Sequence, residues 1–380
     1  MFDKLSRRNI LKLMTGGIFS TFKLLNADNK RSSTMFKKGK NMSGIINMVN
    51  LPEVGPWPTR DPFLFCVHHN DIYPRAKEDL TPDANLNDRN IGQDFSDKDG
   101  WSMYHGNKIP GFPKHPHRGF ETLTIVDKGI IDHSDSLGAS ARYGDGDAQW
   151  LTAGDGINHA EMFPLFDKHK SNPIDFFQIW INLPSINKRV PPHFSMFWKK
   201  DIPKIKFKVS QNIITEIEVI AGDYNLKEAP KPPPHSWAKN KKNDVAVWVA
   251  RIDKNGVWDI PVTKNDTLRS LYVSKGNNIS INNQKISPGN RIDLIPNLDI
   301  RVQNNGPRTK LLLLQGQPIK EPVVQYGPFV MNSKAEIQEA FDDYNQTKFG
   351  EWNWESSAPV HGNKREKFAK LIDGATERPS

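Results

Sequence analysis

Short stretches in which apolar and polar residues alternate recur along the chain, and they predict β-strands rather than long amphipathic helices. Clear examples are residues 121–126, 130–133, 149–152 and 176–183. A second series of such stretches follows over residues 245–314, with turn signals at Pro288-Gly289-Asn290 and Asn304-Asn305-Gly306. The pattern predicts an all-β protein built from sandwiches or small barrels.

Two β-domains in tandem are expected, because 380 residues exceed one ordinary domain and the strands form two series. Residues 227–243 are rich in proline, which lacks a ladder donor and favours extended backbone, so they are predicted to be the linker. The expected organisation is a leader over 1–45, an N-terminal domain over 46–226, a C-terminal domain over 244–331, and a helix with a tail over 332–380.

The segment after the second strand series has a different pattern. Ser333 and Glu336 form a capping-box pattern, which predicts the start of a short helix. Its apolar face would pack on the sheets through Ile337, Ala340, Phe341 and Tyr344. Beyond residue 351 we expect little order apart from Trp352 and Trp354.

The formal charge of +9 is concentrated at the N-terminus, where residues 1–40 hold ten Lys and Arg against two Asp and so account for +8. The rest of the chain offers no basic face for phosphates, so nucleic-acid binding is not expected. Residues 6–12 resemble a twin-arginine export signal, which predicts a periplasmic protein. The alternative is a cytoplasmic protein whose basic N-terminus holds two adjacent arginines by chance. No membrane span is expected, because the apolar stretch over residues 13–22 is too short.

Two histidine motifs carry the candidate chemistry. His115 and His117 lie two residues apart, so on a strand both side chains would face the same side. His159 and Glu161 repeat this spacing, and Gly154 and Gly156 permit a tight turn or a close backbone approach just before them. Three imidazoles and one carboxylate suit a divalent first-row metal and leave positions open for oxygen or a substrate.

Other interpretations of these residues are open from spacing alone. His115 could be a turn residue beside Pro113, and His159 a hydrogen-bonded core histidine. Glu121 is a rival ligand, since it keeps the strand parity of His117 and parity cannot choose between it and Glu161. His133 and the pair His68-His69 are further candidates, each expected to be structural or superficial.

The C-terminal domain is not expected to bind a metal in the same way. No histidine occurs between His235 and His361, so the strands of residues 245–314 cannot build a three-histidine site. A structural role, closing one side of a pocket or stabilising the first domain, is predicted for it.

The motif His-Pro-His-Arg-Gly-Phe-Glu at residues 115–121 resembles the pirin family of the cupin superfamily. Further matches follow in order and are densest over residues 111–200; they include Asp135-Ser-Leu-Gly138, Gly146-Asp-Ala-Gln-Trp150, Thr152-Ala-Gly154, His159-Ala-Glu-Met162, Gln178-Ile-Trp-Ile-Asn-Leu183 and Gly327-Pro-Phe-Val-Met-Asn332. The resemblance implies a double cupin whose N-terminal barrel holds one metal ion, usually iron, through the positions His115, His117, His159 and Glu161. It thus favours Glu161 over Glu121.

The sequence also differs from the family pattern near the approach to the site. Cys66-Val67-His68-His69 stands where acidic or aromatic residues are common, and Tyr326 stands where a histidine is common. An insertion over residues 82–109 is expected to lengthen the approach.

Resemblance to pirins with quercetin 2,3-dioxygenase activity implies an enzyme that cleaves quercetin-like flavonols or other phenolics with O2. Fe(II) is the expected metal, with Mn, Ni, Cu and Zn as alternatives, and Glu161 would be both a ligand and the catalytic proton acceptor. The alternative is a non-catalytic, redox-responsive metal-binding module that contacts a protein partner, which the sequence does not identify. A purely structural metal is a third reading.

Overall fold

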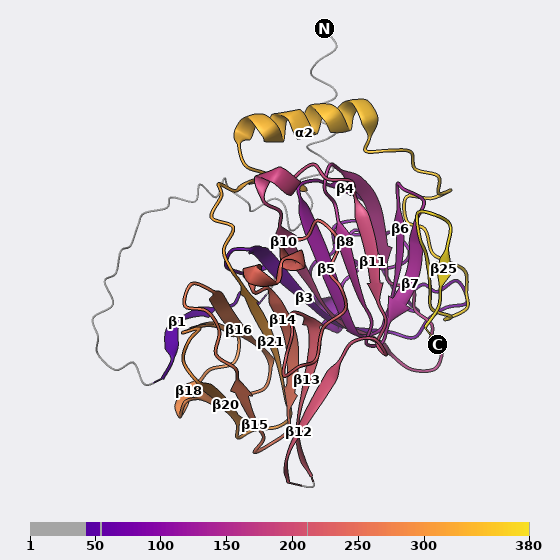
Figure 1. The fold of residues 1–380 in the computed structure, drawn as a ribbon. Coiled ribbons are helices and arrows are strands. Elements are labelled where there is room, and N and C mark those ends of the chain that lie inside the picture. The colour runs from indigo at the N-terminus through magenta and orange to yellow at the C-terminus, as the bar shows by residue number, and fades with distance from the viewer. Residues whose placement is uncertain (1–42, 54, 211, 380) are drawn as a thin grey trace.

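The computed structural model describes residues 43–379 except 54 and 211, and it shows two β-sandwiches with the helix α2 across one end (Figure 1). The predicted all-β architecture is confirmed. The predicted twin-arginine motif lies outside the described residues. Within the described part of the chain, none of the helices has the length and apolar character needed to cross a bilayer.

The first sandwich consists of two six-stranded sheets. One has the order β11-β8-β5-β10-β3-β2, with bounds His193–Phe197, Ala148–Thr152, Phe120–Lys128, Asn172–Asn182, Phe63–Tyr73 and Trp57–Pro58. The other has the order β25-β24-β7-β6-β9-β4, with bounds Thr376–Glu377, Phe368–Lys370, Ser140–Gly144, Ile130–Asp135, Ile157–Met162 and Gly111–His117. Alternate apolar residues of both sheets, such as Val126, Leu151, Ile131 and Ile157, form the core between them.

The second sandwich packs a seven-stranded sheet on a four-stranded one. The larger sheet has the order β1-β19-β16-β21-β14-β13-β12, with bounds Ile45–Asn50, Asn290–Leu294, Leu268–Lys275, Thr309–Gly316, Ala246–Ile252, Ile213–Ala221 and Lys204–Ser210. The smaller has the order β15-β20-β17-β18, with bounds Val257–Ile260, Ile300–Asn304, Ile279–Ile281 and Gln284–Ile286. The strand series expected over residues 245–314 therefore forms this second sandwich.

The chain passes between the two sandwiches repeatedly. Strands β1, β12 and β13 lie within residues 46–226 or just before them, yet β1 pairs with β19 and β13 pairs with β14 in the second sandwich. The segment 227–243 contains the short 3-10 helices η4 (Trp237–Lys239) and η5 (Lys241–Asn243). The predicted domain boundaries stay predictions. Residues 227–243 do not separate the two sandwiches cleanly, because strands of the second sandwich lie on both sides of this segment in the sequence.

The two sandwiches share an apolar layer. Phe177 and Ile179 of β10 and Cys66 of β3 pack with Val247 of β14 and Leu312 of β21 in one buried cluster. Every second residue of each of these strands points toward the other sandwich. The sheets that meet in the middle of the molecule are therefore buried on both of their faces. Such an interface behaves as part of the core rather than as a flexible junction.

A chain of ion pairs runs along the edge of this layer. Asp175 of β10 lies 2.9 Å from Nε2 of His68 and 2.7 Å from Nζ of Lys310 in β21. Lys310 also reaches Asp127 at 3.0 Å, and Asp127 reaches Arg251 of β14 at 2.7 Å. Burial alone would raise the pKa of Asp175, but the hydrogen bond from His68 and the charge of Lys310 lower it to about 2.

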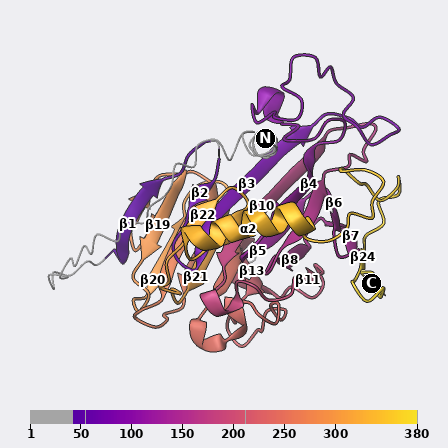
Figure 2. The same cartoon turned by 90° about the horizontal axis from the view of Figure 1, so that it is seen from above.

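Helix α2 (Lys334–Thr347) begins as the sequence predicts. The Ser333 hydroxyl accepts a hydrogen bond from the Glu336 amide at 3.2 Å, and Ile337 and Ala340 are buried. The helix packs on the hairpin of β22 (Val324–Tyr326) and β23 (Phe329–Met331). Figure 2 shows it lying across the ends of strands from both sandwiches.

The expectation of little order beyond residue 351 is wrong. β24 pairs with β7, Trp354 donates to the carbonyl of Asp135 at 2.9 Å, and the His361 amide donates to Asp132 at 2.8 Å. Arg142, buried beside Asp132, donates to the carbonyl of Gly362 at 2.9 Å. The tail is thus ordered by hydrogen bonds to distant strands, which its polar, pattern-poor sequence does not reveal.

The interface ion pairs give a stability prediction. Because the pKa of Asp175 is lower in the folded than in the unfolded protein, its carboxylate contributes stability above about pH 4 that is lost as the pH falls toward about 2. Asp175→Asn should therefore lower the free energy of unfolding by about 2 kcal/mol near pH 6, and the difference from wild type should shrink between about pH 4 and pH 2. Denaturant unfolding at several pH values measures this, and a difference that does not change with pH would contradict it.

Candidate metal centre

The pairing of two strands brings the histidine motifs together. β4 and β9 run antiparallel with His115 opposite His159, and His117 lies two residues further along β4 on the same face. The ring centroids are 4.7 Å apart for His115 and His117, 4.4 Å for His115 and His159, and 4.8 Å for His117 and His159. One nitrogen from each ring lies within 4.8 Å of the others, a spacing that one metal ion can bridge.

Glycines shape the turn before β9. Gly154 has φ +48° and Gly156 has φ +128°. Residues other than glycine rarely adopt these positive backbone angles. A Cβ at Gly156 would lie 2.6 Å from the ring of Phe349, in the segment that follows α2. The predicted tight turn and close approach are both present, and they place His159 at the cluster.

The hydrogen bonds of the three rings leave nitrogens without partners. Nδ1 of His115 donates to the carbonyl of Pro113 at 2.9 Å, which leaves Nε2 as an acceptor. Nδ1 of His117 and both nitrogens of His159 are buried without a hydrogen-bond partner in the described structure. Burying unpaired polar atoms costs free energy, and a metal ion would offset this cost by taking their lone pairs. The residues therefore fit a metal ion.

The three rings are also in the correct protonation state for ligation. Burial lowers the pKa of His115 to about 4 and lowers the pKa values of His117 and His159 well below the ordinary value, and the neighbouring imidazoles lower those of His117 and His159 further. Neutral imidazoles have free lone pairs, so metal binding at neutral pH need not displace protons from them.

Glu161 lies beside the cluster rather than within its closest group. Its Oε2 is 3.9 Å from Nε2 of His159 and accepts a hydrogen bond from Nε2 of Gln178 at 2.8 Å. Burial raises the pKa of Glu161, an effect opposed by the Gln178 hydrogen bond and by His133. The structure thus places the carboxylate next to His159, while its role as fourth ligand and as catalytic residue stays a prediction.

The rival candidates are engaged elsewhere. The oxygens of Glu121 accept hydrogen bonds from the hydroxyls of Thr152 at 2.7 Å and Ser236 at 2.6 Å, so this buried carboxylate is held between β8 and the segment before η4. Nε2 of His133 lies 3.1 Å from Asp135. Among the described residues, the three histidines of β4 and β9 are the one group of His, Cys, Asp or Glu with metal-binding spacing, so the second sandwich shows no comparable site.

A cavity of about 440 Å³ opens above the cluster. His115, His117 and Glu161 line it together with the aromatic rings of Phe65 and Trp180. The insertion over residues 82–109 contributes Gly92, Gln93, His105 and Asn107 to the outer wall of the cavity. The C-terminal tail contributes Ser357. A cavity of this size with apolar walls and a few polar groups suits a small flat ligand.

Sequence reasoning did not identify three of the cavity residues as functional candidates. Gln178 shares strand parity with Trp180 on β10, so its orientation toward the cavity could have been found from the strand pattern. His105 and Ser357 reach the cavity from the insertion and from the tail. Nothing local in the sequence signals that these two segments meet.

Metal binding has a direct test in thermal unfolding. Adding Ni²⁺ or Zn²⁺ to metal-free protein should raise the Tm, because an ion that binds only the folded state stabilises it by about 2.7 kcal/mol at a concentration one hundred times its Kd. His159→Ala should abolish this increase, whereas His169→Ala, which removes an exposed histidine, should not. An increase that survives in His159→Ala would place the bound ion elsewhere.

Comparison with known proteins agrees with the fold and the motifs. Residues 57–181 match the Pirin family and residues 247–350 match the Pirin C-terminal cupin domain. Pirin-1 of Arabidopsis thaliana is 37% identical over 245 residues, which cover 63% of this chain and 78% of that protein. A Pseudomonas aeruginosa protein named as a proposed quercetin 2,3-dioxygenase is 34% identical over 243 residues, which cover 63% of this chain and 79% of that protein.

A solved structure supports the same assignment. The crystal structure of quercetin 2,3-dioxygenase from Acinetobacter baumannii superposes with a TM-score of 0.62 at 26% identity, covering 80% of this chain and 98% of that one. The predicted double cupin is thereby confirmed, with one cupin for each β-sandwich. The resemblance read from the motif at residues 115–121 is confirmed as well, and the chain belongs to the pirin family.

Proposed function

We propose that this protein is an iron-dependent dioxygenase that cleaves quercetin-like flavonols or other phenolics with O2. The observation that carries the proposal is the cluster of three neutral imidazoles, two of which, His115 and His117, line an aromatic-walled cavity of about 440 Å³. The names of the Pseudomonas relative and of the Acinetobacter structure support the same substrate class.

The cavity residues suggest how a flavonol would be held. Phe65 and Trp180, whose ring centroids lie 4.2 Å apart, offer apolar surface to a flat ring system. Trp180 also meets the His117 ring edge to face at 5.1 Å, so a ring lying against it would be directed toward the histidines. Closing the aromatic walls around the substrate would exclude water from the reacting atoms.

His115, His117 and His159 would hold the iron, with Glu161 as the fourth ligand. When bound, the ion supplies a Lewis acid that lowers the pKa of the substrate's 3-hydroxyl, and open positions for that oxygen and for O2. The reaction consumes one O2, opens the central ring of the flavonol and releases carbon monoxide.

In this proposal Glu161 would take the proton of the substrate hydroxyl. The side-chain amide of Gln178 donates to its carboxylate at 2.8 Å and would fix the orientation of the carboxylate oxygens toward the cavity. Gln178 acts as a positioning residue in this scheme, because it touches the carboxylate and also lines the cavity.

Oxygen uptake tests the proposal. Iron-loaded protein given quercetin should consume O2 while the flavonol absorbance falls, and His117→Ala should do neither because it cannot retain the iron. Absence of uptake by protein shown to hold one iron would contradict quercetin cleavage and favour the alternative, a non-catalytic metal-binding module with a protein partner.

The two buried carboxylates provide a matched comparison for the proton acceptor. Glu161→Gln should lower kcat by about 10²-fold to 10⁴-fold in protein with its iron content measured, because proton transfer by a positioned base contributes about that much. Glu121→Gln should keep kcat near the wild-type value, because Glu121 bonds Thr152 and Ser236 instead. Equal losses in both variants would show that Glu161 has no specific role.

A further inference from the structure

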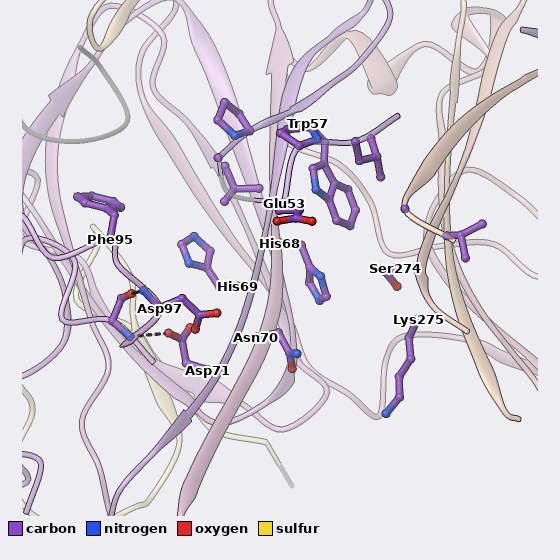
Figure 3. Close-up of a pocket in the computed structure, with 18 of the residues that line it drawn as sticks. Glu53, Trp57, His68, His69, Asn70, Asp71, Phe95, Asp97, Ser274 and Lys275 are labelled. Carbon is purple, nitrogen blue, oxygen red and sulfur yellow. Dashed lines mark hydrogen bonds between the residues drawn. The ribbon is translucent and has the colours of Figure 1, made fainter. Parts of the chain in front are cut away.

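A second cavity, of about 640 Å³, lies between the two sandwiches and outside the metal centre (Figure 3). Its wall on one side consists of residues 51–53 and 55–57 and of the strand β3 over residues 67–71. The insertion contributes Phe95, Asp97 and Tyr104, and the second sandwich contributes residues 273–276 and 288–289. The cavity therefore exists only because the insertion and the second cupin both reach β3.

One wall of this cavity is an open strand edge. β2 pairs with β3 at Phe65 and Cys66 only, and on that side of β3 no described strand pairs with residues 67–71. The other side of β3 is paired with β10 through Tyr73. Because the backbone groups of a strand point alternately to its two sides, part of the N–H and C=O groups of residues 67–71 face the cavity without a ladder partner.

The ionisable side chains make the cavity acidic. Glu53 and Asp97 are exposed carboxylates without an ion pair in the described part of the chain. Asp71 beside Asp97 is buried and accepts hydrogen bonds from the Ser102 amide at 2.9 Å and the Tyr104 hydroxyl at 2.8 Å. Among the described residues that line the cavity, Lys275 is the single lysine or arginine. Carboxylates therefore outnumber basic side chains there.

Aromatic rings stand next to these carboxylates. Trp57 comes from the same loop as Glu53 and is held by stacking on Tyr272 of the second sandwich, with centroids 5.9 Å apart. Phe95 comes from the same loop as Asp97 and packs against Tyr104 at 5.4 Å. A cation between carboxylates and aromatic faces gains both charge attraction and cation–π attraction.

The ring of His69 offers a hydrogen-bond acceptor to which no described residue donates. Its side chain is 4% exposed, stacks on Phe176 at 4.3 Å, lines the cavity and has no hydrogen bond to a described residue. Burial lowers its pKa to about 3, so the ring is neutral and offers a lone pair. An N–H donor entering the cavity would pair with this lone pair.

We propose that this inter-domain cavity is a second ligand site that binds a small organic cation bearing an aromatic ring, of the arylalkylamine class. The ammonium group would lie between Glu53 and Asp97 and donate to His69, and the ring would rest against Trp57 or Phe95. Val67 and His69 line both cavities, so the two adjoin at β3, but Glu53 and Asp97 line only this one and would place the ammonium group away from the metal centre.

Calorimetric titration with phenethylamine tests the charge requirement. The amine should bind the full-length protein with a Kd of about 1 mM or lower, a fragment-like affinity. The neutral 2-phenylethanol and the anionic 3-phenylpropanoate, which share its ring and approximate length, should bind at least about tenfold more weakly. Equal binding of the amine and the alcohol, or no amine binding at 10 mM (about ten times that Kd), would overturn the proposal.

Matched variants test the location. Asp97→Asn and Glu53→Gln should each weaken phenethylamine binding about fivefold, and the double variant by tenfold or more, since each removes one facing charge. Asp299→Asn removes the same charge from an exposed turn of the second sandwich and should leave the Kd unchanged. All three side chains are exposed, so the variants should remain folded, which circular dichroism checks. Binding unaffected by the double variant would place the amine elsewhere and refute the site.

Discussion

The antiparallel pairing of β4 with β9 is the interaction on which the candidate metal centre depends. It sets His115 opposite His159, and the two-residue repeat of a strand then brings His117 and Glu161 to the same side. A slip of one residue would turn either pair to the other face of the sheet. β9 is held on its second edge by β6, where Glu161 pairs with His133, so the register is constrained from both sides. Gly156 completes the constraint, because only a residue without a Cβ lets Phe349 pack so closely on the turn before β9.

The second cupin donates no ligand to the metal centre. It supports the centre indirectly, because it packs against β10 of the first sandwich. Phe177 and Ile179 of this strand are buried against the second sandwich, whereas Gln178 and Trp180, on the opposite face, line the metal cavity. Packing between the sandwiches therefore positions the residue that holds the Glu161 carboxylate. The ion pairs from Asp175 through Lys310 to Arg251 secure the same junction at its edge. This arrangement agrees with the structural role that the absence of histidines between His235 and His361 predicts.

Local pattern was sufficient to predict most strands, the capped helix and the parity of the histidine pairs. These features depend on residues a few positions apart, which sequence periodicity records directly. It could not choose between Glu121 and Glu161; the family resemblance favoured Glu161, and the structure shows that Glu121 bonds a residue before η4 while Glu161 lies beside His159.

What sequence pattern missed comes from contacts between distant segments. The tail beyond residue 351 looked unstructured because its order depends on Asp132, Asp135 and β7, more than two hundred residues earlier in the chain. The insertion was expected only to lengthen the approach, yet it supplies His105 to one cavity and Asp97 to the other. The exchange of β1, β12 and β13 into the second sandwich was likewise invisible, since their own alternation fits either sheet.

We infer that one metal ion is held by the histidines of β4 and β9. Anomalous diffraction at the iron edge, from crystals of anaerobically iron-loaded protein, tests it most directly. We expect a single strong peak among the rings of His115, His117 and His159, about 2.0–2.2 Å from one nitrogen of each. No peak there in protein that contains one iron, or a peak at another group of side chains, would contradict it.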